Sequence, residues 1–246
     1  MIILEDVTVV IGTGAKKRDL LTSVRARLPS GHRIAVLARR PEDRKVFIDL
    51  LSGVVLPTAG RIIRKARVGF PPGHLGGFAP GLSVRLNVSH VARLYGAEIE
   101  ATVNFVAKVS GFSENFSKPY RELSNIQRRH LSTILAFSIP FDVYLLSDEL
   151  VRTGGRGYSK EASALFQARA KTSGMIIASD DSAFIREFCD MGLVLNGGQI
   201  RLFPDIERAI SFFEKAPVTI PIKGKEEKRA ARKRERRRQR KASKEK

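Results

Sequence analysis

The chain has 246 residues, of which 43% are hydrophobic, and a formal net charge of +19, so it is long enough to bury a sizeable core in one domain. No apolar run approaches the roughly 18–20 residues that a membrane-spanning helix needs. The single cysteine, Cys189, excludes an internal disulfide and favours a reducing compartment. The acidic N-terminal segment MIILEDVTVV predicts no export signal, which makes the cytoplasm the expected location.

The first part of the chain is predicted to be rich in strands. Residues 2–10 and 19–28 have a strand-like composition, and the segment between them is turn-prone. Residues 33–38 form a short continuous apolar run, which is typical of a strand buried on both faces, and residues 45–52 follow with helical spacing. Residues 60–70 predict two more strands.

The rest of the chain is predicted to begin with helices and then to alternate. The helical pattern extends from about residue 80 to residue 140, with helices expected over 82–96, 98–112 and 123–139. Strands and helices then alternate, with strands at 142–146, 174–179, 191–196 and 199–203 and helices at 159–171, 181–189 and 204–215. The pair Asn196-Gly197 is a hairpin signal. This order predicts an α/β sandwich with a helical subdomain.

The C-terminal segment 223–246 is strongly basic. It holds 14 Lys or Arg and 4 Glu, a net +10 that leaves +9 for the residues before it. Because it has no aromatic or branched aliphatic residue, it cannot offset its chain entropy by burial, and we expect it to be disordered. It is either a solvated tail or a contact for anionic membrane lipid or polysaccharide. Each Lys or Arg near an anionic membrane surface contributes about 1 kcal/mol to binding. Nucleic acid is less favoured as a partner because no stacking aromatics are interleaved.

Four separated segments carry a family resemblance. They are GGFAPGLSVRLNVSHVARLYG at 76–96, ILEDVT at 3–8, FDVYLL at 141–146 and EFCD at 187–190. Together they resemble the ATP-binding subunit of ATP-binding cassette (ABC) transporters, and most of all the capsular polysaccharide export branch. The resemblance runs from Met1 to about residue 215. It implies an ABC-type, P-loop-NTPase-like sandwich over 1–222, with a helical subdomain at about 80–140 and the basic tail beyond it.

The resemblance also implies cofactors, partners and a location. The cofactors would be ATP and Mg²⁺. The partners would be a transmembrane exporter subunit, docked on the helical subdomain over Phe78 to Gly96, and a second ATP-binding subunit in a homo- or heterodimer. The chain would then lie on the inner face of the inner membrane.

The family's phosphate loop, Gly-x-x-Gly-x-Gly-Lys-Ser-Thr, aligns without gaps on residues 38–46 and differs there. Its glycines fall on Ala38, Pro41 and Asp43, its Lys on Arg44, its Ser on Lys45 and its Thr on Val46. A proline removes an N–H donor, Asp43 brings a carboxylate among phosphates, and no hydroxyl is left for Mg²⁺. The candidate phosphate-binding side chains are Arg39, Arg44 and Lys45. The alternative is a strand-to-helix turn whose charges are solvated.

Three further positions differ from the family pattern. The adenine-stacking aromatic falls near Ile11, which has no ring. The signature loop Leu-Ser-Gly-Gly-Gln reads LSNIQ, in which Ser124 and Gln127 are retained as candidate binding residues and Ile126 replaces a glycine that approaches the partner's nucleotide. The switch histidine is replaced by Asp180, whose carboxylate would repel a phosphate.

An acidic pair at the end of a predicted strand matches the family best. By resemblance, Asp148 would bind Mg²⁺ and Glu149 would be the catalytic group that polarises the attacking water. Counting forward from Phe141 instead places Ser147 and Asp148 in these two roles, whereas counting back from residues 164–166 favours the first assignment. A carboxylate pair here could also cap the following turn.

Three functions are compatible with these observations. The favoured one is a degenerate ATP-binding subunit of a polysaccharide exporter that hydrolyses ATP weakly or not at all. The second is an active ATPase with an altered phosphate loop. The third is a basic adaptor that binds anionic membrane or nucleic acid through its tail.

Overall fold

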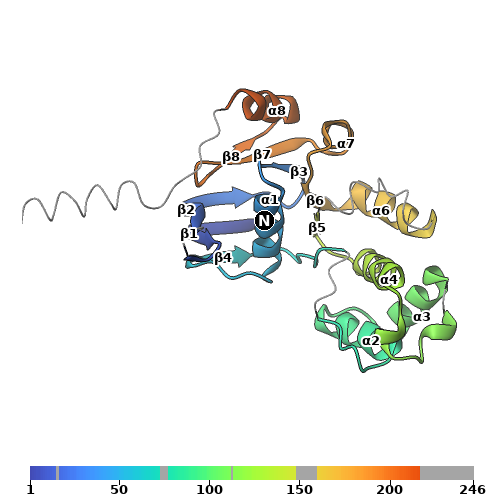
Figure 1. The fold of residues 1–246 in the computed structure, drawn as a ribbon. Coiled ribbons are helices and arrows are strands. Elements are labelled where there is room, and N and C mark those ends of the chain that lie inside the picture. The colour runs from blue at the N-terminus through green and yellow to red at the C-terminus, as the bar shows by residue number, and fades with distance from the viewer. Residues whose placement is uncertain (15–16, 73–76, 112, 148–159, 217–246) are drawn as a thin grey trace, which may run out of the picture.

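Two β-sheets and a set of helices around them form the molecule, as Figure 1 shows. The structure is a computed structural model and is described for residues 1–14, 17–72, 77–111, 113–147 and 160–216. The smaller sheet has the strand order β2-β1-β4 and is antiparallel throughout. Its strands are β1 (Ile2–Ile11), β2 (Arg18–Leu28) and β4 (Ala59–Arg64).

The larger sheet has the order β5-β6-β3-β7-β8, in which the first four strands are parallel. These strands are β5 (Val143–Leu146), β6 (Gly174–Ala178), β3 (Arg33–Leu37), β7 (Met191–Asn196) and β8 (Gln199–Phe203). β8 pairs antiparallel with β7 through the predicted hairpin. Gly197 and Gly198 form its turn, with φ angles of 59° and 79°. Residues other than glycine are strained in this left-handed conformation.

The two faces of the larger sheet pack against different partners. On β3, Ile34 and Val36 belong to a core shared with the smaller sheet and with α1 (Pro41–Ser52), which lies between the two sheets. Ala35 and Leu37 belong to the opposite core, which is covered by helices. This alternation along one strand explains the continuous apolar run in the sequence, because both faces are buried.

Two predicted elements in the first part of the chain were placed wrongly. α1 begins at Pro41 and not at residue 45, because proline suits the first helical position and the acidic Glu42 and Asp43 favour the first turn. The segment 60–70 forms one strand, β4, and the second predicted strand is reduced to an isolated bridge between Val68 and Val143.

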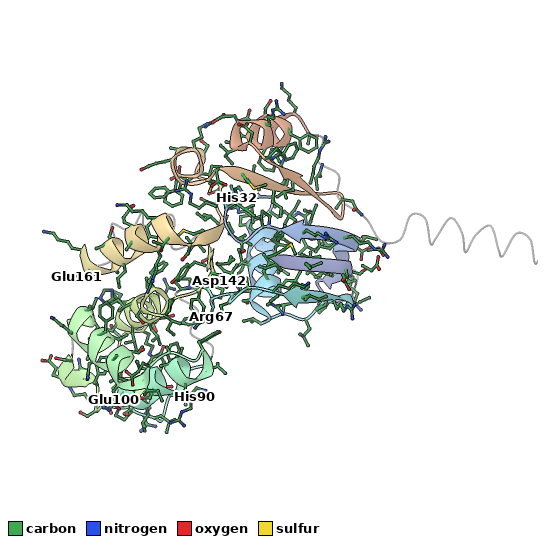
Figure 2. The ribbon with its side chains drawn as sticks, turned by 180° about the vertical axis from the view of Figure 1, so that it is seen from behind. His32, Arg67, His90, Glu100, Asp142 and Glu161 are labelled. Atoms are coloured by element: carbon green, nitrogen blue, oxygen red, sulfur yellow. The ribbon has the colours of Figure 1, made fainter. Side chains whose placement is uncertain are left out.

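The predicted helical subdomain consists of α2 (Val84–Leu94), α3 (Ile99–Ser110) and α4 (Asn125–Ser138), with short 3₁₀ turns at Ser113–Asn115 and Tyr120–Glu122. These helices lie together to one side of the sheets (Figure 1). Figure 2 shows Arg67 and Asp142 close together where the sheets meet this subdomain. The Arg67 backbone N–H donates to the Asp142 carboxylate at 2.8 Å, and its side chain donates to the Tyr95 carbonyl, also at 2.8 Å.

Within the described ranges, the same face of the larger sheet is also covered by α6 (Lys160–Thr172), α7 (Ser182–Phe188) and α8 (Ile206–Lys215). Among the described residues, no helix is long and apolar enough to cross a membrane. The α/β sandwich with a helical subdomain that the sequence predicts is therefore confirmed. The predicted disordered tail, 223–246, lies outside the described residues.

Candidate functional site

The strand-to-helix connection at residues 38–40 joins β3 to α1, at the carboxyl end of the parallel strands. In open α/β sheets, ligands bind at this edge. Arg40 is the N-cap of α1 with φ −111° and ψ 128°, and its side chain makes no capping hydrogen bond. Pro41 follows at the first helical position, so the helix begins with one N–H donor fewer than a glycine-containing loop would offer.

Arg44 is the buried cation of this connection. Only 3% of its surface is exposed. Its Nη1 donates to the Ala38 carbonyl at 2.9 Å, and its Nη2 donates to Oδ2 of Asp180 at 3.0 Å. Asp180 follows β6 along the chain. Relative to the family pattern, Arg44 replaces a Lys and Asp180 replaces a His. These two differences are far apart in the sequence, but in the fold they form one ion pair.

Arg39 is directed away from the connection, toward the end of α8. Its guanidinium donates to the Phe213 carbonyl and, at 3.3 Å each, to the carbonyls of Glu214 and Ala216. Its Cζ lies 4.2 Å from the centroid of the Phe213 ring. Arg39 thus caps the C-terminal end of a helix, where a positive charge is favourable.

The remaining charges of the connection also have partners in the chain. Lys45 Nζ lies 2.7 Å from Oδ2 of Asp49, one helical turn away. Asp43 forms an ion pair with Arg18 of β2. The expectation that these charges are solvated is wrong for Arg44, which is buried, while the Lys45 side chain remains 67% exposed.

A cavity of about 300 Å³ lies beside the connection. Its walls come from the end of β3, the start of α1, the Ser179–Asp180 segment, α7 and α8. Arg39 and Arg44 line it, whereas Lys45 does not. The structure therefore brings two of the three predicted phosphate-binding cations to one cavity.

The retained residues of the signature loop serve the helix that they begin. Ser124 is the N-cap of α4, and its hydroxyl accepts from the Gln127 backbone N–H at 3.2 Å. The Gln127 side chain accepts in return from the Ser124 N–H at 2.9 Å. This reciprocal pair is a capping box. Neither residue lines the cavity, and Ile126 beside them is 79% exposed.

The predicted acidic pair, Asp148 and Glu149, lies outside the described residues, so the choice between it and Ser147–Asp148 stays a prediction. β5 ends at Leu146, directly before these positions. Ile11 is the last residue of β1 and is partly buried against the core shared by the sheets. Within the described ranges, no group of three or more His, Cys, Asp or Glu side chains could hold a metal ion.

The sequence analysis missed the contribution of α8 and the pairing of Arg44 with Asp180. The α8 contribution has no local sequence signal, because it depends on how the last helix packs. The pairing has one: two positions of the family pattern carry opposite new charges. Such a pair of substitutions would have suggested a contact.

No protein-family model matches the chain. Among curated proteins, it is 28% identical to the polysialic acid transport ATP-binding protein KpsT of Escherichia coli over 218 residues, which cover 87% of this chain and 99% of that protein. It is 25% identical to the capsule polysaccharide export ATP-binding protein CtrD of Neisseria meningitidis serogroup B, over 81% of this chain and 92% of that protein.

Solved structures of ABC cassettes share the fold. The dimeric post-hydrolysis structure of the cassette MJ0796 bound to ADP and Pi has a TM-score of 0.60 and 16% identity, covering 82% of this chain and 97% of that one. An ATP-binding subunit of an ABC transporter has a TM-score of 0.61 and 15% identity, covering 88% and 95%. The resemblance seen in the sequence is confirmed: the fold is that of an ABC ATPase cassette, and its homologues are capsule and polysaccharide export ATP-binding proteins.

Proposed function

We propose, starting from this fold and these homologues, that the chain is the cassette subunit of a capsule-type polysaccharide export transporter. Its partners would be a transmembrane exporter subunit and a second ATP-binding subunit, which places it on the inner face of the inner membrane. We further propose that it hydrolyses ATP weakly or not at all and acts as a structural or regulatory partner. The ion pair between Arg44 and Asp180 carries this second proposal.

We infer that a magnesium nucleotide does not fit residues 38–46. A phosphate loop needs free backbone N–H groups, a cation facing the phosphates and a hydroxyl for Mg²⁺. Here Pro41 lacks an N–H, the Arg44 guanidinium faces a carboxylate of its own chain, and Lys45 stands where the hydroxyl is needed. A phosphate group would have to displace Asp180 and remain beside it, at a cost in repulsion.

The proposed docking surface for the transmembrane subunit is α2 and the residues around it, over Phe78 to Gly96. Leu82, Leu86 and Leu94 in this range are exposed. Exposed leucines on one short segment are more than isolated surface apolar residues and suit contact with another protein. Phe105 on the neighbouring α3 is also exposed.

Steady-state ATP turnover by the purified chain tests the proposal. We expect no phosphate release above a protein-free control, with Mg²⁺ and millimolar ATP, either alone or reconstituted with its transmembrane partner. An ABC cassette with intact motifs serves as the positive control in the same assay. Steady turnover by the purified chain would overturn the proposal of a non-hydrolysing subunit.

A second candidate, an active ATPase with an altered site, is favoured by one observation. The Lys45 side chain is 67% exposed, and its ammonium pairs with the largely buried carboxylate of Asp49 one helical turn away. Pairs with this spacing contribute about 0.3–0.5 kcal/mol. Lys45 could therefore turn toward a ligand. This candidate predicts turnover in the parent protein that Lys45→Ala abolishes, and absence of turnover in the parent disposes of it.

A further inference from the structure

The two members of the Arg44–Asp180 ion pair differ in their exposure to solvent. The Arg44 side chain is 4% exposed, whereas the Asp180 side chain is 64% exposed. Arg44 is also held by its hydrogen bond to the Ala38 carbonyl. The guanidinium therefore stays where it is, and a buried guanidinium is destabilising unless an anion lies beside it.

We propose that Asp180 is an autoinhibitory, displaceable anion that occupies the place on Arg44 where a phosphate group can bind. This inference rests on the proposed function, in which the site has lost its nucleotide, and it adds which group of the chain took that place. The ligand class is a phosphate group, either as free phosphate or as the terminal group of a nucleotide.

The Asp180 side chain can turn away from Arg44 without disturbing the start of α7, provided that another anion takes its place. Asp180 lies between the end of β6, at Ala178, and Asp181, the N-cap of α7. The Asp181 side chain accepts from the N–H groups of Ala183 and Phe184 at 3.0 and 3.1 Å, so the helix start does not depend on Asp180. Because the Asp180 carboxylate is already mostly in water, turning it outward exposes little additional surface.

Space for the incoming ligand lies next to the pair. Arg44 and Asp180 both line the 300 Å³ cavity, and Ser179 and Ser182 also belong to its lining. A cavity of this size is at the lower end of the roughly 300–1,000 Å³ typical of small-molecule sites. Arginine donates to phosphate and carboxylate oxygens alike, so a phosphate oxygen can replace the Asp180 oxygen on Nη2 of Arg44.

The decisive variant is Asp180→Asn, which removes the charge and keeps the shape. Its Tm is measured with and without 20 mM inorganic phosphate, against sodium chloride at matched ionic strength. We expect the variant to melt about 4 °C below the parent without phosphate, and phosphate to raise its Tm by about 3 °C or more. The parent should gain less than 1 °C.

The matched control is Asp181→Asn, which removes the same charge one residue away. Asparagine still caps α7, and Arg44 keeps its partner, so phosphate should not stabilise this variant beyond chloride. Adding Arg44→Gln to Asp180→Asn should remove the phosphate effect. Isothermal titration of phosphate into Asp180→Asn alone gives a second measurement in case the double variant does not fold.

Tm measurements with ADP and with adenosine distinguish free phosphate from a nucleotide phosphate as the ligand. ADP that stabilises Asp180→Asn no more than phosphate does supports a site for the free group, and a larger shift with ADP, but not with adenosine, supports a nucleotide phosphate. Equal phosphate shifts in the parent, Asp181→Asn and Asp180→Asn would overturn the proposal, as would no shift in Asp180→Asn. Neither result bears on ATP turnover, so this inference and the proposed function can fail separately.

Discussion

Arg39, directly after β3, stacks on Phe213 of α8, with its Cζ 4.2 Å from the ring centroid, while its guanidinium donates to the last carbonyls of the same helix. A residue aligned with the family's phosphate loop therefore ties that loop to the last described helix. The Arg39 guanidinium stabilises the end of α8, so its N–H donors there are not directed at a ligand.

Arg39→Ala should lower the free energy of unfolding by about 1–2 kcal/mol, because it removes a helix-capping contact and an exposed cation–π contact. The corresponding fall in Tm is about 3–6 °C, measured by thermal denaturation. Arg40→Ala is the control, since the Arg40 side chain makes no capping hydrogen bond. Equal stability of the two variants would contradict the role given to Arg39.

Gly192→Ala should destabilise the packing of α8 on β7. A Cβ at this glycine would lie 2.1 Å from the Ala209 Cβ, so the helix would have to move. We expect a loss of about 1–3 kcal/mol, as for overpacked cores, read out by chemical denaturation. Adding Ala209→Gly should recover part of the loss. Gly81→Ala, where a Cβ meets open space, is the control, and a similar loss there would argue against this explanation.

Cys189 should be almost unreactive in the folded protein. Burial raises the pKa of its thiol from 9.0 to about 12, and the thiolate is the nucleophile. At pH 8 we expect iodoacetamide to label the native protein about 10³-fold more slowly than the urea-unfolded chain. Rapid labelling of the native state at pH 8 would be inconsistent with this burial.

The same shift in pKa has a defined effect on stability. Because the folded pKa of Cys189 exceeds the unfolded value of 9.0, the unfolded state loses this proton first as the pH rises. The contribution of the thiol to stability is therefore present below pH 9 and is lost progressively between pH 9 and about 12.

Leu86→Asp should weaken docking on the transmembrane subunit without unfolding the chain, because Leu86 is exposed on α2. We expect a severalfold smaller fraction of the protein on membranes that contain its exporter partner, measured by co-sedimentation, and an unchanged Tm. Leu56→Asp is the control: Leu56 is also exposed but lies between α1 and β4. Equal losses in both variants would contradict α2 as the docking surface.

Deletion of residues 223–246 tests the tail, which carries a net +10. We expect attachment to vesicles with anionic lipids to be lost at about 0.15 M salt, where the Debye length is about 8 Å, and the Tm to stay unchanged if the folded domain ends near residue 222. Vesicles of neutral lipid are the control. Attachment that survives the deletion would exclude the tail as the contact.

Much of the fold followed from local patterns. The apolar run of β3 and the hairpin at Gly197 are determined by neighbours in the sequence. The capping box at Ser124 and Gln127 is local as well, but these residues were interpreted as part of a signature loop. The start of α1 was placed four residues late, because Pro41 was taken as a loop residue and not as the first residue of a helix.

The site was less predictable because its contacts join distant segments. Arg44 and Asp180 are separated by 136 positions and Arg39 and Phe213 by 174. Charge alone indicated where a phosphate could bind, but whether each cation was available depended on tertiary partners. The expectation of solvated charges was wrong for Arg44, since only the fold shows that it is buried.

Equilibrium titration of ATP with Mg²⁺ into the purified full-length chain tests the central claim, that its own side chains occupy the phosphate site. We predict no saturable heat or fluorescence change below millimolar ATP. A micromolar dissociation constant for the parent protein would contradict the claim, because ATP would then displace Asp180 without difficulty.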